Sequence, residues 1–168
     1  MNRDIEIANH HERLKISRKA IVTLFANLDR LSFAKVGPGD LSIVFMDNAR
    51  IGRLHDQFMN DPEATDVITF KGDPHLGFAG EICVSAEYAA ESAPRHDLPF
   101  SEELSLYLVH GWLHLAGYDD RCDEDRAAMR EAERRAMAEL KAMGPLPSFR
   151  IGIMRRLKTM LPKRKHRD

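Results

Sequence analysis

The pattern of hydrophobic and polar positions predicts strands and helices that alternate along the chain. The expected strands cover residues 4–8, 41–46, 66–70 and 81–85, and the expected helices cover residues 17–31, 47–59, 86–92, 101–114 and 122–143. The last two strands are separated by residues 71–80, which contain three glycines and one proline and so favour turns. We therefore expect a single α/β (α+β) domain in which one mixed sheet of about four strands packs with helices.

The helix expected at residues 101–114 has too many apolar positions for a surface helix. Leu104, Leu106, Leu108 and Val109 do not share one face, so we expect a central helix that is buried on most sides. Gly117 follows it, where the end of a helix favours a left-handed residue.

Length and composition indicate one soluble globular domain. The chain has 168 residues, of which 43% are hydrophobic and 30% charged, a balance that excludes a disordered protein. It contains neither a signal-peptide core nor an apolar run near the roughly 18 residues of a membrane span, so we expect a cytoplasmic protein without a transmembrane segment. Cys83 and Cys122 are the only cysteines, and we expect reduced thiols.

Charge is unevenly distributed along the chain, although the formal net charge is only −1. Residues 150–168 hold eight Lys or Arg and one acid, a charge of +7 that leaves −8 for residues 1–149. We predict a folded domain over residues 1–148 and a basic amphipathic tail over residues 149–168. Such a tail is a solvated end, or a segment that contacts RNA or an anionic surface.

His110 and His114 lie four residues apart in the central helix. Residues at this spacing share a helix face, so both imidazoles can turn toward one metal ion. Gly117 allows the chain to reverse, and Asp120 can return as a third ligand that leaves a fourth position open for water. Two core histidines and an acidic helix start would explain these residues one by one, but their combination favours a catalytic metal site.

The same residues follow the spacing H-x3-H-x2-G-x2-D, which parallels the metzincin peptidase pattern H-E-x-x-H-x-x-G-x-x-H. In those peptidases a Glu directly after the first His acts as the general base. Here that position is Gly111, which has no side chain to accept a proton. A metalloprotease-like hydrolase is therefore an alternative that needs its base from elsewhere.

The segment His110-Gly-Trp-Leu-His-Leu-Ala-Gly-Tyr-Asp-Asp120 resembles H-G-x-L-H-L-x-G-Y-D-H, the signature of the YbeY-type endoribonucleases. Ten of the eleven positions agree, counting the two variable ones, and Asp120 stands where the family usually has its third His. Thr65-Asp-Val-Ile-Thr-Phe70 is similar to the family's T-D/N-V-L-S-F, and Gly80-Glu-Ile is similar to its G-D-I. The resemblance covers residues 40–143.

This resemblance implies an α/β fold with one mixed sheet and one Zn²⁺ ion at His110, His114 and Asp120, although other divalent ions suit the same donors. It implies a metal-dependent endoribonuclease that cleaves single-stranded RNA. It further implies maturation of the 3′ end of 16S ribosomal RNA and a role in ribosome quality control, with ribosomal RNA and the small ribosomal subunit as partners.

Two positions depart from the family pattern. Asp120 in place of His keeps a competent ligand but makes the site less positive by one charge. Met59 stands where many members carry an Arg, and no Arg lies between Arg53 and Thr65. We therefore expect phosphate contacts from other basic residues, for which the candidates are Arg50, Arg53, Lys71 and Arg95.

The expected chemistry uses a metal-bound water as nucleophile or general acid–base, because Gly111 leaves no side-chain base in the usual place. Glu103 lies seven residues before His110 on the same helix face. It is a candidate for orienting a ligand or relaying a proton, and the alternative is a helix-start residue that complements the macrodipole. Besides the endoribonuclease and the metalloprotease, a non-catalytic ribosome-associated factor that keeps its metal for folding fits the residues.

Overall fold

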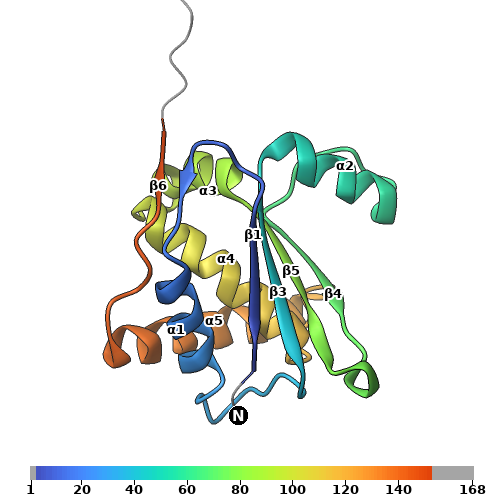
Figure 1. Ribbon diagram of the computed structural model, residues 1–168, viewed down its shortest axis with the longest axis vertical. Coiled ribbons are helices and arrows are strands. Elements are labelled where there is room, and N and C mark those ends of the chain that lie inside the picture. The colour runs from blue at the N-terminus through green and yellow to red at the C-terminus, as the bar shows by residue number, and fades with distance from the viewer. Residues whose placement is uncertain (1–2, 153–168) are drawn as a thin grey trace, which may run out of the picture.

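The computed structural model describes residues 3–152 (Figure 1). The helices are α1 (Arg18–Leu28), α2 (Asn48–Met59), α3 (Ala86–Ser92), α4 (Phe100–Leu115) and α5 (Asp123–Met143). The strands are β1 (Ile5–Asn9), β2 (Leu14–Lys15), β3 (Asp40–Met46), β4 (Val67–Lys71), β5 (Phe78–Ser85) and β6 (Arg150–Ile151), and two short 3-10 turns are η1 (Pro74–Leu76) and η2 (Ala93–His96). Every strand and helix expected from the sequence is present, with bounds that differ by at most three residues.

Four strands form one mixed sheet in the order β1-β3-β5-β4. The pairs β1–β3 and β3–β5 are parallel, whereas β4 is antiparallel to β5 and lies at the edge of the sheet. In Figure 1, α1, α4 and α5 gather beside one face of this sheet, and α2 lies apart from them near the end where β4 begins. These findings confirm the expected α/β fold with a four-stranded mixed sheet.

The central helix α4 is buried as its apolar pattern predicts. Trp112, Leu104 and Leu108 are fully buried in it, and α4 packs against α3, α5, β4 and β5. Gly111 allows α4 to lie close against the sheet, because a Cβ added at this position would lie only 2.5 Å from Cγ2 of Ile82. Position 111 therefore faces the sheet.

The folded body extends past the boundary at residue 148 that the sequence suggested. Phe149 is buried against Phe45, with ring centroids 5.8 Å apart. Strand β6 then pairs with β2, so that Ile151 lies opposite Leu14. Residues 149–152 thus belong to the body rather than to a tail, because their apolar side chains complete its core; the rest of the predicted tail, residues 153–168, lies outside the described residues.

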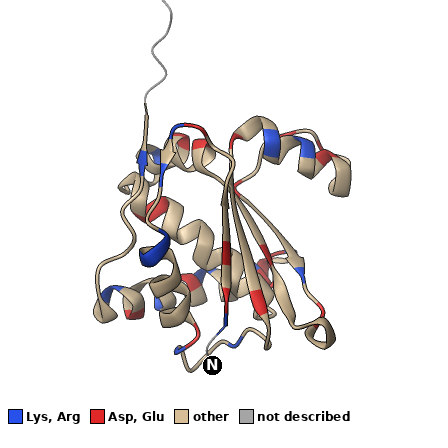
Figure 2. Cartoon of the chain, in the orientation of Figure 1, with Lys and Arg blue, Asp and Glu red and all other residues tan. Residues whose placement is uncertain are grey.

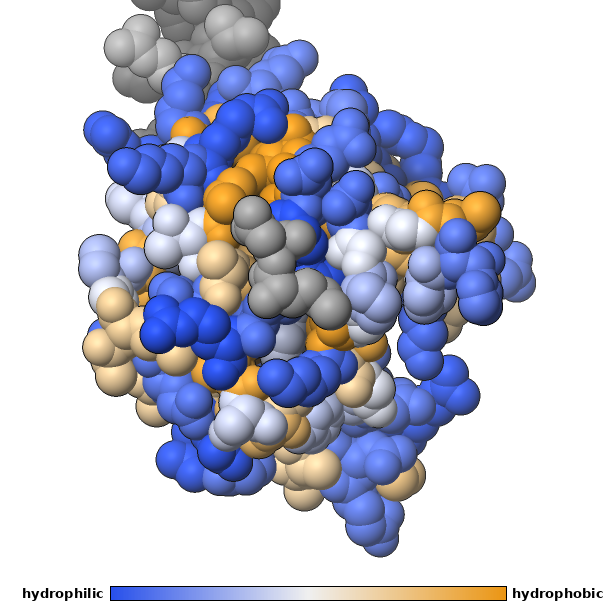
Figure 3. All heavy atoms as spheres, turned by 60° about the horizontal axis from the view of Figure 1, so that its bottom comes forward, coloured by the Kyte–Doolittle hydropathy of each residue, from blue (hydrophilic) through white to orange (hydrophobic). Residues whose placement is uncertain are grey.

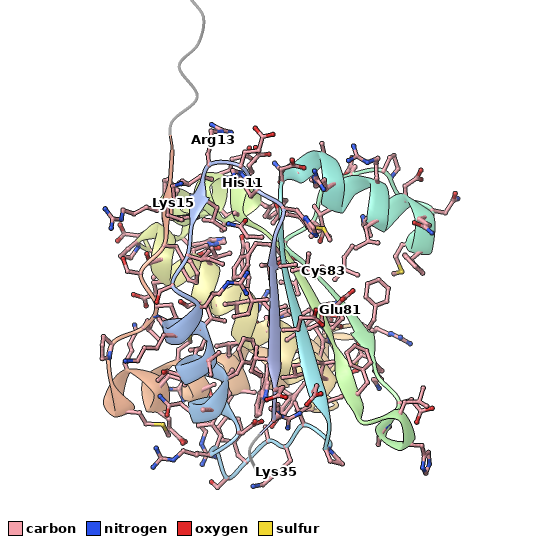
Figure 4. The ribbon with its side chains drawn as sticks, in the orientation of Figure 1. His11, Arg13, Lys15, Lys35, Glu81 and Cys83 are labelled. Atoms are coloured by element: carbon pink, nitrogen blue, oxygen red, sulfur yellow. The ribbon has the colours of Figure 1, made fainter. Side chains whose placement is uncertain are left out.

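The two cysteines differ sharply in environment. Both are free, with Cys83 buried on β5 and Cys122 exposed before α5. Figure 4 shows Cys83 close to Glu81 on the same strand, and the thiol donates to Glu81 Oε1 over 3.7 Å. Burial, with the nearby Glu81 charge, raises the pKa of Cys83 to about 12.

Most large hydrophobic side chains that remain exposed lie at the end of α2 and on the β4–β5 hairpin. Phe58 and Met59 keep 56% and 67% of their surface, and Leu76 keeps 81%. The face drawn in Figure 3 is largely hydrophilic, and the hydrophobic residues visible on it gather in limited groups. Across residues 3–152, no helix combines the length and the apolar character required to cross a bilayer.

Candidate metal centre

The last turn of α4 and the loop after it bring the three predicted ligands together. Gly117 has a positive φ of 102°, which favours glycine. The N–H of Tyr118 donates to the carbonyl of Leu113 over 3.0 Å, which closes the end of the helix. The chain reverses at Gly117, as the sequence predicted, and Asp120 returns to the helix face that carries His110 and His114.

Three donor atoms converge at this point. His110 Nε2 lies 2.9 Å from His114 Nε2, and Asp120 Oδ2 lies 3.7 Å and 3.6 Å from the two nitrogens. Ligand atoms around a tetrahedral zinc ion, each roughly 2.0–2.1 Å from the metal, are about 3.3 Å apart. The spacing of the three donors therefore fits one ion, and it is the sole such cluster of His, Cys, Asp and Glu in residues 3–152.

Each histidine is held by a hydrogen bond on its other ring nitrogen. His110 Nδ1 bonds Glu133 Oε1 of α5 over 2.5 Å, and His114 Nδ1 bonds the Tyr118 carbonyl over 3.1 Å. A carbonyl only accepts, so Nδ1 of His114 carries the proton and Nε2 keeps its lone pair. A carboxylate on Nδ1 fixes the ring of His110 in the same way and makes Nε2 a better metal donor.

Burial and charge shift the two histidine pKa values in opposite directions. Burial acts to lower the pKa of His110, but the hydrogen bond and charge of Glu133, with Asp66 and Asp120 nearby, outweigh it and raise the pKa. Burial and the neighbouring His110 lower the pKa of His114. The protein thus favours a neutral imidazole at His114, which is the form that binds a metal.

Asp120, the third candidate ligand, is the most exposed of the three. The side chain of Asp120 keeps 45% of its surface, against 17% for His110 and 23% for His114. Its backbone N–H donates to Asp119 Oδ1 over 2.8 Å, and its carbonyl accepts from Arg126 over 3.2 Å. The backbone around Asp120 is therefore fixed while the carboxylate faces solvent.

The cluster opens into a groove of about 470 Å³ between α2, β4 and the loop after α4. Its lining residues are His55, Met59, Thr65, Val67, Ile68, Thr69, Lys71, His114, Gly117, Tyr118, Asp119, Asp120 and Arg121. The groove has room for a substrate beside the cluster of His110, His114 and Asp120.

Of the four predicted phosphate-binding residues, Lys71 lines this groove. The other three do not line the groove. Arg50 forms an ion pair with Asp47 at 3.8 Å, and Arg95 donates to a backbone carbonyl over 3.2 Å. Arg53 is likewise absent from the lining. In Figure 2, basic residues on α2 and at the end of β4 lie on the same side of the molecule. Arg121, which the sequence did not single out, is a second cation in the lining.

Glu103 does not lie where it could orient a ligand or relay a proton at the cluster, which is the role that the sequence suggested. Its side chain is fully buried, and its Oε1 lies 2.8 Å from Nδ1 of His96. Seven residues along a helix correspond to about 10 Å, so it does not reach the cluster. The carboxylate that orients His110 is Glu133 instead, 23 residues later in sequence. Nothing in the alternation of charges along α5 distinguishes Glu133 from its neighbours, so the sequence offered no signal for it.

Comparison with known proteins points to one family. The sequence model of "Endoribonuclease YbeY" matches residues 6–141. The chain belongs to the YbeY endoribonuclease family. A protein of that name from Protochlamydia amoebophila is 44% identical over 108 residues, which are 62% of this chain and 72% of that protein. One from Chlamydia trachomatis serovar L2 is 34% identical over 140 residues, 77% of this chain and 83% of the relative.

A solved structure supports the same fold. The solution structure of TM1509 from Thermotoga maritima superposes with a TM-score of 0.58 at 26% sequence identity, covering 83% of this chain and 90% of that one. Membership of the YbeY family makes the protein an endoribonuclease, a hydrolase that acts on RNA. The metalloprotease and the non-catalytic factor are not favoured.

Proposed function

We propose that the protein is a zinc-dependent endoribonuclease specific for single strands, with one ion held by His110, His114 and Asp120. Its proposed substrate is the 3′ end of 16S ribosomal RNA on the small ribosomal subunit, with a role in ribosome quality control in the cytoplasm. The observation that supports this proposal most is the convergence of Nε2 of both histidines and Oδ2 of Asp120 within 3.7 Å of one another, beside an open groove.

A zinc ion bound here would supply Lewis acidity toward the phosphate and a water of lowered pKa. The protein's own part is to hold and orient the ligands. Glu133 and the Tyr118 carbonyl fix the two imidazole rings, so little reorganisation accompanies metal binding. Asp120, in place of a neutral His, leaves the centre one charge less positive, which lowers its attraction for the anionic phosphate.

Position 111 explains why peptidase chemistry is unsuited to this scaffold. A side chain at Gly111 would enter the contact with Ile82 of β5 rather than the metal groove. A Glu at that position could not act as the general base of a metzincin peptidase without moving α4 from the sheet.

Lys71 and Arg121 are the groove residues suited to hold RNA phosphates. Arg121 also pairs with Asp119 at 3.2 Å, and its side chain is 86% exposed, so it can turn toward a substrate at small cost. Asp119 and Asp120 oppose an approaching phosphate, and a divalent cation at the cluster would offset their charge.

The direct test compares substrates and variants. Wild-type protein loaded with zinc, His114→Ala, and the control His75→Ala, whose exposed side chain lies on η1, are each incubated with a single-stranded 16S rRNA precursor and with an unstructured peptide. We expect wild type and His75→Ala to cut the RNA only, and His114→Ala to cut neither. Peptide cleavage, or RNA cleavage retained by His114→Ala, would contradict the proposal.

We also propose that the basic C-terminal segment contributes to ribosome association. A chain that ends at Gly152 keeps Phe149 and β6, and we expect it to unfold at the same temperature as wild type but to sediment less with small subunits. Ending the chain at residue 148 instead removes the buried Phe149, which costs about 3–5 kcal/mol of unfolding free energy. Unchanged sedimentation of the chain ending at Gly152 would rule out this role.

A further inference from the structure

Strand β4 has a free edge. It is the last strand in the order β1-β3-β5-β4, and its one neighbour in the described part of the chain is β5. An edge strand exposes backbone N–H and C=O groups that can bind another molecule.

The hydrogen bonds at both ends of the β4–β5 ladder fix their direction. The N–H of Ser85 donates to the carbonyl of Asp66 over 2.9 Å, and the N–H of Gly72 donates to that of Ala79 over 3.2 Å. In an antiparallel pair every second residue bonds the partner strand. Residues 66, 68, 70 and 72 therefore face β5, while residues 67, 69 and 71 direct their N–H and C=O groups away from it.

Two of the outward N–H groups lack a partner. The N–H of Val67 donates to Asp66 Oδ1 over 2.8 Å. For Thr69 and Lys71, no acceptor for the backbone N–H exists among residues 3–152. Two residues of strand separate these donors by about 6.8 Å, which is close to the separation of neighbouring phosphates in an extended single strand.

The same edge forms one wall of the metal groove. Val67, Thr69 and Lys71 line it together with His114 and Asp120. The methyl groups of Val67 and Thr69 lie 3.2 Å and 3.3 Å from the place of a Cβ on Gly111, which shows that these side chains face α4. The two free donors, the Lys71 ammonium and the metal cluster thus border one space.

We propose that the N–H groups of Thr69 and Lys71, with the Lys71 ammonium, bind successive phosphates of a single-stranded RNA that follows β4 to the metal cluster. Backbone N–H groups are regular phosphate ligands in protein–nucleic acid contacts. An extended peptide could also pair with a free strand edge, but the ammonium beside these donors favours an anionic ligand. The inference rests on the proposed endoribonuclease function and names the residues that position its substrate.

The first test uses wild-type protein, and its controls lie in the same strand. Amide exchange measured by NMR is expected to be fast at Thr69 and Lys71 and slow at Ile68 and Phe70. Adding a single-stranded oligothymidylate, which carries phosphates but is no substrate for a ribonuclease, should slow exchange at Thr69 and Lys71. The proposal would be overturned if exchange at Thr69 and Lys71 did not change, or if an unstructured peptide alone slowed it. It would also be overturned if protection rose with protein concentration, which would indicate pairing with a second copy of the chain.

The second test removes one donor. Thr69→Pro deletes the N–H without breaking the ladder, because Pro is tolerated on an edge strand where its nitrogen faces outward. Thr69→Val keeps the N–H and the side-chain shape as the matched control. We expect Thr69→Pro to bind the oligothymidylate about tenfold more weakly than Thr69→Val, and Lys71→Gln to lower the salt slope of binding by about one.

If a correctly folded Thr69→Pro binds the oligothymidylate as tightly as Thr69→Val, the contact between the Thr69 N–H and a phosphate is refuted. If Thr69→Pro does not fold, the amide exchange of the wild-type protein decides whether the contact exists. The proposed function fails separately, through zinc-dependent RNA cleavage that survives in His114→Ala or is absent from wild type.

Discussion

Glu133 allows a direct test of how residues behind the candidate ligands affect metal affinity, because it contacts the cluster only through its hydrogen bond with His110. Replacing it with Gln keeps an oxygen that can accept the proton of His110 Nδ1 but removes the charge. Removing a partner of this kind from a metal-bound His typically costs 10–100-fold in metal affinity, or about 1.4–2.7 kcal/mol. A hydrogen bond to a charged acceptor is about twice as strong as one to a neutral acceptor.

We therefore expect Glu133→Gln to weaken zinc binding by about tenfold and Glu133→Ala by nearer 100-fold. Competition with a chromophoric chelator measures the zinc Kd, and thermal unfolding of the metal-free proteins shows whether the fold is kept. Glu131→Gln is the matched control, since Glu131 is exposed on the same helix and pairs with Arg134 rather than His110. A zinc Kd of Glu133→Gln within twofold of wild type, or an equal loss of zinc affinity in Glu131→Gln, would show that Glu133 does not strengthen zinc binding through His110.

Three further predictions follow from single residues. Asp120→His replaces a carboxylate with a neutral imidazole and so makes the proposed metal site more positive by one charge; kcat for RNA cleavage should therefore rise severalfold, and a fall in kcat with zinc fully bound would contradict this effect of charge. Because the pKa of Cys83 is raised to about 12, its thiol stays protonated at pH 8, and a disulfide reagent should label Cys122 alone until the protein unfolds. Fast labelling of both thiols would contradict the burial of Cys83. Gly111→Ala gains about 1 kcal/mol of helix propensity but loses about 1–3 kcal/mol to overpacking, so denaturant unfolding should show equal or lower stability, and a more stable variant would contradict the close contact with Ile82.

Local patterns were sufficient to predict most of the fold. Side chains alternate every two residues along a strand and recur every 3.6 residues along a helix, because local backbone geometry sets both periods. The four strands of the sheet and all five helices could therefore be located from the hydrophobic pattern. Strands β2 and β6 are two residues each, too short to produce a pattern. Their pairing joins Leu14 to Ile151 across most of the chain, and only the three-dimensional packing of Phe149 shows that the folded body extends past residue 148.

The cluster of His110, His114 and Asp120 could be predicted because the three residues lie within eleven positions of one another, on a helix and the turn that follows it. Helical geometry places His110 beside His114, and Gly117 indicates the reversal that returns Asp120. Glu133 could not be predicted, because the crossing of α4 and α5 decides which of the many acids of α5 meets His110. The free donors on β4 are equally non-local, since they depend on the order of strands in the sheet.

A single metal ion at His110, His114 and Asp120 is proposed to drive RNA cleavage. Adding zinc stepwise to metal-free protein and measuring the initial rate of cleavage of a single-stranded RNA tests this role. We expect a rate that rises linearly, reaches a plateau at one zinc per chain and stays at background in His114→Ala. Full activity in the presence of a strong chelator, or a plateau unchanged in His114→Ala, would contradict it.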